Sequence, residues 1–318
     1  MGRLLLRRGA ETLLVLLLVS FLIYALIGLM PGDPIDLMLS ADPRFTTADA
    51  ARLKALYGLD RPLLERYFRW LQRALTGDFG YSRLYGQPVF AVIWPRLLNT
   101  LLLMGTSFLL ALAIAIPAGI LAAMRPRSLL DTVINLLAFA GFSVPSFWLS
   151  LMLIVLFAVV LGWLPAGGVA SVGDGGLLDR LAYLVLPVAA LTLLTAGTFL
   201  RFVRAAMIEA LQEDHIRTAR AKGCGAVRIV LAHALPNAMI PVVTVVALHF
   251  GALLSGALVV ETVFSYLGMG KLIYDAILGN DYNLALAALL LGTALTLIAN
   301  LLADIVYLEL DPRIHDGL

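Results

Sequence analysis

The chain has 318 residues, of which 61% are hydrophobic and only 14% are charged. Soluble domains are about 45–50% apolar and about 25% charged, so a soluble fold could not cover this much apolar surface. The single cysteine, Cys224, excludes a disulfide scaffold, and the formal net charge of +2 argues against a nucleic-acid partner. The composition therefore predicts an integral membrane protein that crosses the bilayer several times.

Six stretches without Asp, Glu, Lys or Arg are long enough for a transmembrane helix, which needs about 20 apolar residues. They lie within Thr12–Met30, Leu97–Met124, Thr132–Leu161, Leu181–Leu200, Ile229–Val260 and Tyr282–Ala303. Because these runs are continuous and do not alternate, they predict helices and not a barrel. The first stretch follows three arginines and superficially resembles a signal peptide. It runs into Pro31 without a small-residue cleavage pattern, so we interpret it as an uncleaved span.

The distribution of Lys and Arg predicts the orientation, since short cytoplasmic loops carry an excess of both. With the N-terminus inside, the cytoplasmic segments hold 12 of the 23 basic residues and the external segments hold 11. Nine of those 11 lie in one long segment, Pro31–Arg96, and long loops translocate largely regardless of charge. Without that segment the count is 12 against two, Arg180 and Lys271, which predicts that both termini are cytoplasmic.

The long external segment is itself predicted to contain two helices. Thr46 or Thr47 can cap a short helix that stops at Gly58. Asp60 followed by a proline starts a second helix, which ends near Gly77.

The second external helix is predicted to be amphipathic. Its apolar side chains share one face at helical spacing and comprise Leu63, Leu64, Tyr67, Phe68 and Leu71, with Trp70 beside them. This pattern indicates a helix that lies at the outer membrane interface or on the helix bundle. The basic residues Lys54, Arg66 and Arg69 either meet an external partner or form a solvated face.

Motifs for catalysis and metal binding are missing from the sequence. The string nearest to a phosphate-binding loop, Gly268-Met269-Gly270-Lys271, lacks the required spacing. A serine-elbow pattern begins at Gly141 but ends in Val144, and no paired histidine is evident. The four histidines are scattered: His215, His233, His249 and His315. An intramembrane enzyme and a metal site are therefore both disfavoured.

Groups that could couple transport to an ion gradient are also scarce. A stand-alone secondary transporter usually needs ionisable side chains near the membrane midplane. The candidates here are Glu261, Asp304 and His249, and the two carboxylates lie close to span ends. We expect Glu261 and Asp304 to be interfacial, hydrogen-bonded groups and not a proton relay. If the protein does work, its energy must come from another subunit.

The cytoplasmic stretch Arg201–Leu235, between the fourth and fifth spans, is too long for a simple connector. The run Met207–Lys222 contains good helix formers with cations near its C-terminal end, and Gly223 then ends it. A second short helix, Ala226–Leu235, leads into the fifth span. Two helices that meet at a glycine predict a charged knob that docks on a partner and passes rigid-body motion to the spans. The alternative is a basic loop that only satisfies the positive-inside bias.

Two strings of this stretch resemble the coupling signature of the membrane permease subunits of ATP-binding-cassette (ABC) importers for dipeptides, oligopeptides, nickel or glutathione. They are Ile216-Arg217-Thr218-Ala219-Arg220-Ala221-Lys222-Gly223 and His233-Ala234-Leu235-Pro236-Asn237-Ala238. Other family marks lie in order along the chain: Pro31-Gly32-Asp33-Pro34, Tyr57-Gly58-Leu59-Asp60-Arg61-Pro62, Gly77-Asp78-Phe79-Gly80, Glu261-Thr262-Val263-Phe264 and Leu310-Asp311-Pro312-Arg313-Ile314. The resemblance covers nearly the whole chain. It departs at His215, where the family usually has Tyr, and at Cys224, where Leu is common.

The resemblance implies an all-α integral membrane fold of the type I ABC importer permease kind. It has six transmembrane helices, a long external helical segment after the first span and a cytoplasmic coupling helix between spans four and five. We divide the chain accordingly into the first span with its cytoplasmic end (1–30), the external segment (31–96), the five-helix permease core (97–308) and a cytoplasmic tail (309–318). The coupling segment occupies residues 205–235 of the core.

The resemblance also implies partners in a bacterial inner membrane. These are a second homologous permease subunit, two cytoplasmic ATP-binding subunits and an extracytoplasmic substrate-binding protein. ATP and Mg bind to the ATPase subunits, so this chain is expected to be a transport subunit without catalytic residues or a cofactor of its own. Substrate-binding residues stay unassigned.

The expected coupling residues are Glu213, Asp214, His215, Arg217, Thr218, Ala219, Lys222 and Gly223. By the resemblance, the carboxylates and Arg217 supply polar docking contacts, Ala219 allows close approach and Gly223 makes the bend.

Overall fold

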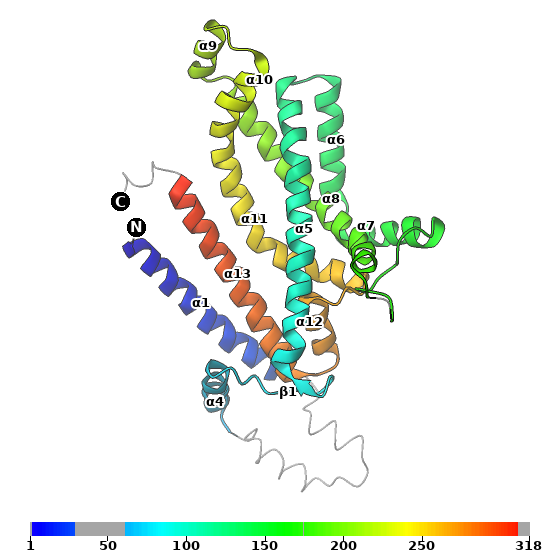
Figure 1. The fold of residues 1–318 in the computed structure, drawn as a ribbon. Helices are drawn as coiled ribbons and strands as arrows, with labels where there is room; N and C mark the ends of the chain where they lie inside the picture. Colours follow the sequence, from blue (N-terminus) through cyan, green and yellow to red (C-terminus); the bar gives the residue numbers. More distant parts are fainter. Residues whose placement is uncertain (1, 29–60, 174, 311–318) are drawn as a thin grey trace. The chain divides into compact units, whose positions relative to one another are not determined.

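The computed structural model describes residues 2–28, 61–173 and 175–310, and within this part of the chain it is dominated by helices (Figure 1). The helices before the cytoplasmic stretch are α1 (Gly2–Gly28), α4 (Leu63–Leu75), α5 (Val89–Met124), α6 (Leu129–Ser143), α7 (Ser146–Leu153), the π-helix η1 (Ile154–Val160) and α8 (Leu177–Ala210). The later ones are α9 (Asp214–Ala221), α10 (Ala226–Arg228), the π-helix η2 (Ile229–Ala234), α11 (Leu235–Val263), α12 (Met269–Leu278) and α13 (Tyr282–Leu310). Two short strands, β1 (Tyr81–Ser82) and β2 (Gln87–Pro88), pair antiparallel.

Five helices in the described part are long and apolar enough to cross a membrane. These segments are Leu6–Gly28, Val89–Met124, Leu177–Ala210, Ala226–Val246 and Tyr282–Ala303. A sixth candidate is the bent pair Leu129–Gly141 and Ser146–Val160. The second predicted external helix is present as α4, whereas the first one, from Thr46 or Thr47 to Gly58, lies outside the described residues.

The third apolar stretch is not the continuous helix that the sequence predicted. Helix α6 ends at Ser143, Val144 has extended backbone angles (φ −85°, ψ 130°), and α7 starts after Pro145. The axis bends by 99° at this break. The cause is local: a proline lacks an N–H donor and drives the residue before it out of the helical region.

The chain divides into two compact units. The first comprises residues 1–97 and 272–295, and it contains α1, α4, the β1–β2 hairpin and the start of α13. Within it, Asp281 accepts hydrogen bonds from Ser82 Oγ (2.5 Å) and from the backbone N–H of Leu84 (3.0 Å). Asn283 Nδ2 donates to the carbonyl of Tyr81 (3.2 Å). These bonds fasten the hairpin to the turn between α12 and α13.

The second unit, residues 98–271 and 296–318, is organised around α8, which packs against α6 and α11. One core cluster consists mainly of small side chains around Phe199: Ala111, Ala115, Ala138, Ala196 and Leu200. A Cβ atom on Gly197 would lie 2.3 Å from the carbonyl oxygen of Ala138. Close packing through small residues is typical of helices in lipid, where no hydrophobic force favours helix contact over lipid contact.

Candidate functional site

The candidate site is the segment Glu213–Gly223, which we call the α9 segment. The sequence predicted one helix from Met207 to Lys222, but α8 ends at Ala210 and α9 begins at Asp214. Glu213 has an extended backbone (φ −66°, ψ 154°) and its carbonyl accepts from the N–H groups of Ile216 and Arg217. A helix start at Glu213 thus divides the run, because its extended backbone cannot continue α8.

The end of α9 has a Schellman cap centred on Gly223. The N–H of Gly223 donates to Arg220 O (2.9 Å) and the N–H of Cys224 donates to Ala219 O (3.1 Å). Gly223 has φ +79°, which L-residues rarely adopt, and a Cβ there would meet nothing within 4 Å. The glycine is therefore required by backbone angle and not by lack of space.

The segment after the cap does not form the separate helix predicted for Ala226–Leu235. Helix α10, η2 and α11 follow one another without an intervening loop. Pro236 is the second residue of α11 and follows the π-helix η2, and the helix continues through it.

The inner face of α9 is buried against the helices on either side of it. Ile216 is fully buried and Ala219 is 7% exposed. Both belong to a cluster that also contains Val203, Met207 and Ala210 of α8, Ile229, Val230 and Ala234 of η2, Ala238 and Val242 of α11, and Ala123 of α5. In this structure Ala219 makes its close contact with the core of its own chain.

The outer face of α9 is charged and open. The side chain of Asp214 is 93% exposed and that of Arg217 is 74% exposed, and the two form an ion pair (3.2 Å). Thr218 and Lys222 are also exposed, and Thr218 Oγ1 donates to the Asp214 carbonyl (3.0 Å). This surface is what a partner would meet.

His215 ties α9 to the start of α11. Its Nδ1 lies 3.2 Å from a carboxylate oxygen of Glu213, and its Nε2 lies 3.2 Å from Asn237 Nδ2. The same Nε2 also lies 3.3 Å from the carbonyl oxygen of His233. Asn237 Nδ2 also donates to the carbonyl of His233 (3.2 Å), so the contact joins α9, η2 and α11.

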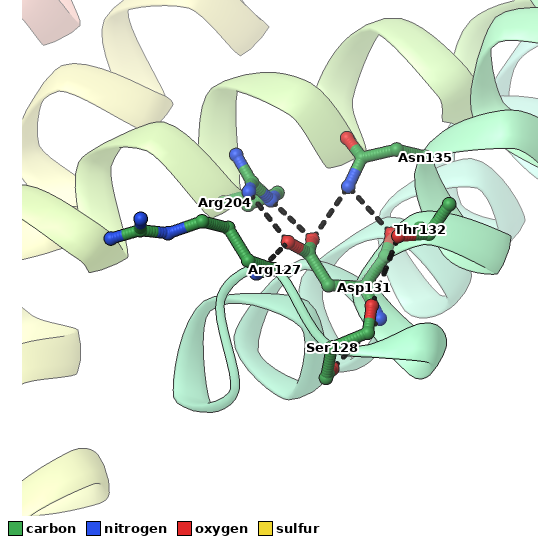
Figure 2. A network of polar contacts seen from close by, with 6 residues as sticks. All are labelled: Arg127, Ser128, Asp131, Thr132, Asn135 and Arg204. Atoms are coloured by element: carbon green, nitrogen blue, oxygen red, sulfur yellow. Dashed lines mark hydrogen bonds and ion pairs between the residues drawn. The ribbon is translucent and has the colours of Figure 1, made fainter.

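A second polar cluster joins α6 to α8, and sequence reasoning did not find it. Asp131 in the first turn of α6 is 4% exposed and receives two hydrogen bonds from Arg204 of α8, at 2.6 and 2.8 Å (Figure 2). It also accepts from the N–H of Arg127 (2.8 Å) and from Asn135 Nδ2 (2.6 Å). Ser128 caps α6 by accepting from the Asp131 N–H. The available signal was the Ser-x-x-Asp spacing of a helix start, which predicts the cap but not the arginine.

Glu261 is fully buried within the second unit, and both of its carboxylate oxygens accept hydrogen bonds. Its carboxylate accepts from Thr100 Oγ1 (2.5 Å) and from the backbone N–H groups of Gly270 (2.7 Å) and Lys271 (3.1 Å). A carboxylate at the first N–H groups of α12 is favourable because those groups carry the positive end of the helix dipole. The expectation that Glu261 is hydrogen-bonded is confirmed, and the group is buried inside the protein. The side chain of Asp304 lies outside the described residues.

Tyr266 follows Glu261 in the loop before α12 and is 3% exposed. Burial, together with the nearby Glu261 charge, raises the pKa of its hydroxyl to about 12. The hydroxyl therefore stays protonated at physiological pH and donates to the carbonyl of Asn99 (3.3 Å).

The described residues contain polar clusters that connect helices and one charged surface. No arrangement of catalytic groups is found among them. Among them, no three His, Cys, Asp or Glu side chains gather in a way that could hold a metal ion. The structure buries Ala219 against the chain's own helices and joins His215 to Asn237, and it leaves Glu213, Asp214, Arg217, Thr218 and Lys222 exposed.

The spanning helices and the bundle around α8 define a polytopic helical membrane protein. Its fold is similar to that of the methionine ABC transporter MetNI in an inward-facing conformation, with a TM-score of 0.55 at 20% identity, covering 67% of this chain and 94% of that one. It is also similar to an amino acid ABC transporter, with a TM-score of 0.54 at 14% identity over 68% of this chain and 93% of that one. These likenesses show that the chain shares the fold of the matched chains of these transporters.

Residues 115–316 match the family described as the binding-protein-dependent transport system inner membrane component, and residues 1–104 match its N-terminal component. The oligopeptide transport system permease protein AppB of Bacillus subtilis is 39% identical over 99% of this chain and 100% of its own length. The dipeptide transport system permease protein DppB of Escherichia coli K12 is 35% identical over 93% of this chain and 94% of its own. The chain belongs to this family of ABC importer membrane components. It is a multi-pass inner-membrane transport subunit that works with an ATPase and a binding protein, and it is not an enzyme.

Proposed function

We propose that this chain is the permease subunit of an ATP-driven importer for dipeptides, oligopeptides or similar small solutes, and that the α9 segment is its coupling helix. The observation that carries the second part is the two-sided character of α9. One face is buried among α8, η2 and α11, while the other presents exposed charges. The names of the relatives AppB and DppB support the substrate class.

The contacts of α9 suit it to pass motion to the spans. Ile216 packs on α8 and η2, and His215 is bonded to the start of α11. Arg204 lies on α8 near the end that leads to α9, and its bond with Asp131 extends the connection to α6. Packed interfaces of this kind move as bodies and do not deform continuously. A push on α9 by an ATPase would therefore displace the three long helices together.

The proposed assembly contains a second homologous permease subunit, two cytoplasmic ATP-binding subunits that hold ATP and Mg, and an external binding protein. The chain is proposed to cross the membrane six times, with both termini cytoplasmic and the bent α6–α7 pair as one span. This topology places the α9 segment on the ATPase side and residues 31–96 on the binding-protein side. It rests on the distribution of Lys and Arg in the short loops.

The alternative of a stand-alone, ion-coupled transporter loses its strongest candidate residue. A proton relay needs a carboxylate that is free to exchange partners. Three donors from neighbouring segments bind the carboxylate of Glu261, and two of them are backbone groups fixed at the start of α12.

The test of the assembly is purification of this chain from its native membrane in mild detergent, with identification of the co-purifying proteins. A second permease and nucleotide-binding subunits are expected. Recovery of a homo-oligomer without an ATPase would contradict the proposal.

The test of the coupling helix is cross-linking of α9 to the co-purified ATPase by a photoreactive reagent attached to single cysteines of this chain. Cysteines at Asp214 and Thr218, both exposed, are expected to cross-link in a Cys224→Ser background. A cysteine at exposed Val227 on α10 is the control. Equal labelling at all three positions, or none at Asp214 and Thr218, would contradict the assignment.

A further inference from the structure

Helix α4 carries an open apolar strip. Leu64, Phe68 and Leu75 are 58%, 62% and 80% exposed. At 3.6 residues per turn, their positions fall within about 40° of one another around the helix axis. We call these three side chains the apolar strip. Three large apolar side chains open on one side of a 13-residue helix form an apolar patch of the kind that marks a protein or membrane contact.

A different side of α4 packs on α1. Tyr67 is 5% exposed, and its hydroxyl lies 2.6 Å from Ser20 Oγ. Its ring meets Phe21 edge-on, with centroids 5.2 Å apart, and Tyr24 at 5.7 Å. Both helices belong to the same compact unit, so the placement of α4 against α1 is defined (Figure 1).

The remaining side of α4 is polar. Glu65 pairs with Arg61 (2.5 Å) and Arg69 (3.0 Å), and Arg66 and Arg73 share this side of the helix. By helical spacing, the arginines of α4 lie about 100–180° away from the apolar strip. The helix thus presents one face to α1, one to an apolar phase and one to water.

The contact with α1 fixes the depth of α4 relative to the membrane. The candidate span Leu6–Gly28 has 23 residues, which is about 35 Å of helix against a hydrocarbon core of roughly 30 Å. Its ends therefore lie near the two interfaces. Ser20 and Tyr24 stand about 12 and 6 Å inside the Gly28 end. Helices that lie in the membrane interface insert about 5–10 Å, which is the same depth.

We propose that α4 is an interfacial helix whose apolar strip contacts the acyl chains of the leaflet at the Gly28 end of α1. The partner is the lipid bilayer itself. Leu64, Phe68 and Leu75 enter the hydrocarbon, Tyr67 and Trp70 stand at the boundary beside α1, and the arginines face the headgroups and water. A water-soluble binding protein would approach from the polar side of α4, where it meets arginines and not the strip. The inference does not depend on the coupling role of α9.

The experiment measures the environment of each face by spin labelling. Single cysteines replace Leu64, Phe68 and Leu75 on the strip, and Glu65, Arg69 and Arg73 on the polar side, in a Cys224→Ser background. The full chain with its co-purifying subunits is reconstituted in vesicles of phosphatidylethanolamine and phosphatidylglycerol. The ratio of oxygen to nickel-chelate collision rates is expected to be several-fold higher at the three strip positions than at the three polar ones.

Two outcomes overturn the proposal. Equal ratios on both faces, with high nickel access, would show that the strip lies in water. Low collision rates with both reagents at the strip would show that a protein subunit covers it.

A second pair of variants avoids the cysteines and the label. Phe68→Trp and Arg73→Trp place the same indole about 140° apart around the helix axis. Lipids brominated near the headgroup end of the acyl chain are expected to quench the added fluorescence in Phe68→Trp several-fold more than in Arg73→Trp. Equal quenching in the two variants contradicts the proposed orientation.

Discussion

Replacing Gly223 with Val tests whether the cap of α9 matters for coupling. The backbone of Gly223 is left-handed, at φ +79°, and a side chain there would meet no atom within 4 Å. The substitution therefore costs only backbone strain, of about 1–3 kcal/mol. A cost of about 2 kcal/mol lowers the population of the capped turn by about 30-fold relative to open forms.

The opened turn loses the two bonds that end the helix, from the N–H groups of Gly223 and Cys224. The exposed face of α9 then no longer has a fixed orientation, while the buried Ile216 keeps the segment attached. We expect the variant to assemble and hydrolyse ATP but to import several-fold less substrate for each ATP consumed. The assay compares uptake and ATP hydrolysis by the purified importer in proteoliposomes.

Gly223→Asn is the matched control, because Asn tolerates the left-handed conformation better than other non-glycine residues. It is expected to recover most of the coupling. Wild-type uptake per ATP in Gly223→Val, or equal defects in both variants, would refute the reasoning.

Three other predictions concern the buried polar residues Asp131, Glu261 and Tyr266. Asp131→Ala leaves the guanidinium of Arg204 without its buried acceptor and should lower the free energy of unfolding by about 2–3 kcal/mol. Thermal unfolding in detergent measures this loss. The control is Asp214→Ala on the exposed face of α9, which should leave the stability unchanged. Glu261→Ala leaves two buried backbone donors without an acceptor and should lower the free energy of unfolding by about 3 kcal/mol. Glu261→Gln should restore most of that stability and keep ATP-driven uptake. Loss of uptake in a stable Glu261→Gln protein would argue for ion coupling. The pKa of Tyr266 rises from 10.0 in the unfolded chain to about 12 in the folded protein, so its contribution of about 3 kcal/mol to stability is complete below pH 10 and is lost as the pH rises towards 12. The stability of Tyr266→Phe should therefore fall less over that range. Parallel curves of stability against pH for the two proteins would contradict the assignment.

Local features of the sequence predicted the elements well where the signal was itself local. The end of α4 near Gly77 and the end of α9 at Gly223 follow from glycines that adopt positive φ. The division at Pro145 was not predicted, although the proline is visible, because prolines inside membrane helices often leave the helix continuous. The break between α8 and α9 has no glycine or proline to signal it.

The pairing of polar groups was the part of the site that the sequence did not reveal. Asp131 and Arg204 are 73 positions apart, and Thr100 and Glu261 are 161 apart. Each carboxylate is recognisable as unusual beside an apolar run. Its partner is selected only when the helices pack, because a buried charge requires donors within bonding distance wherever the fold supplies them.

Composition and the uncharged runs by themselves determined that the chain crosses a membrane as helices, and the motif strings indicated its family. Only the tertiary structure decided which face of each long apolar helix meets protein, as where Ala138 of α6 packs against Gly197 of α8. The reason is physical. Amphipathic helices such as α4 and α9 record their orientation in their periodicity. A helix that is apolar all round does not, because lipid tails and neighbouring helices are equally apolar surroundings.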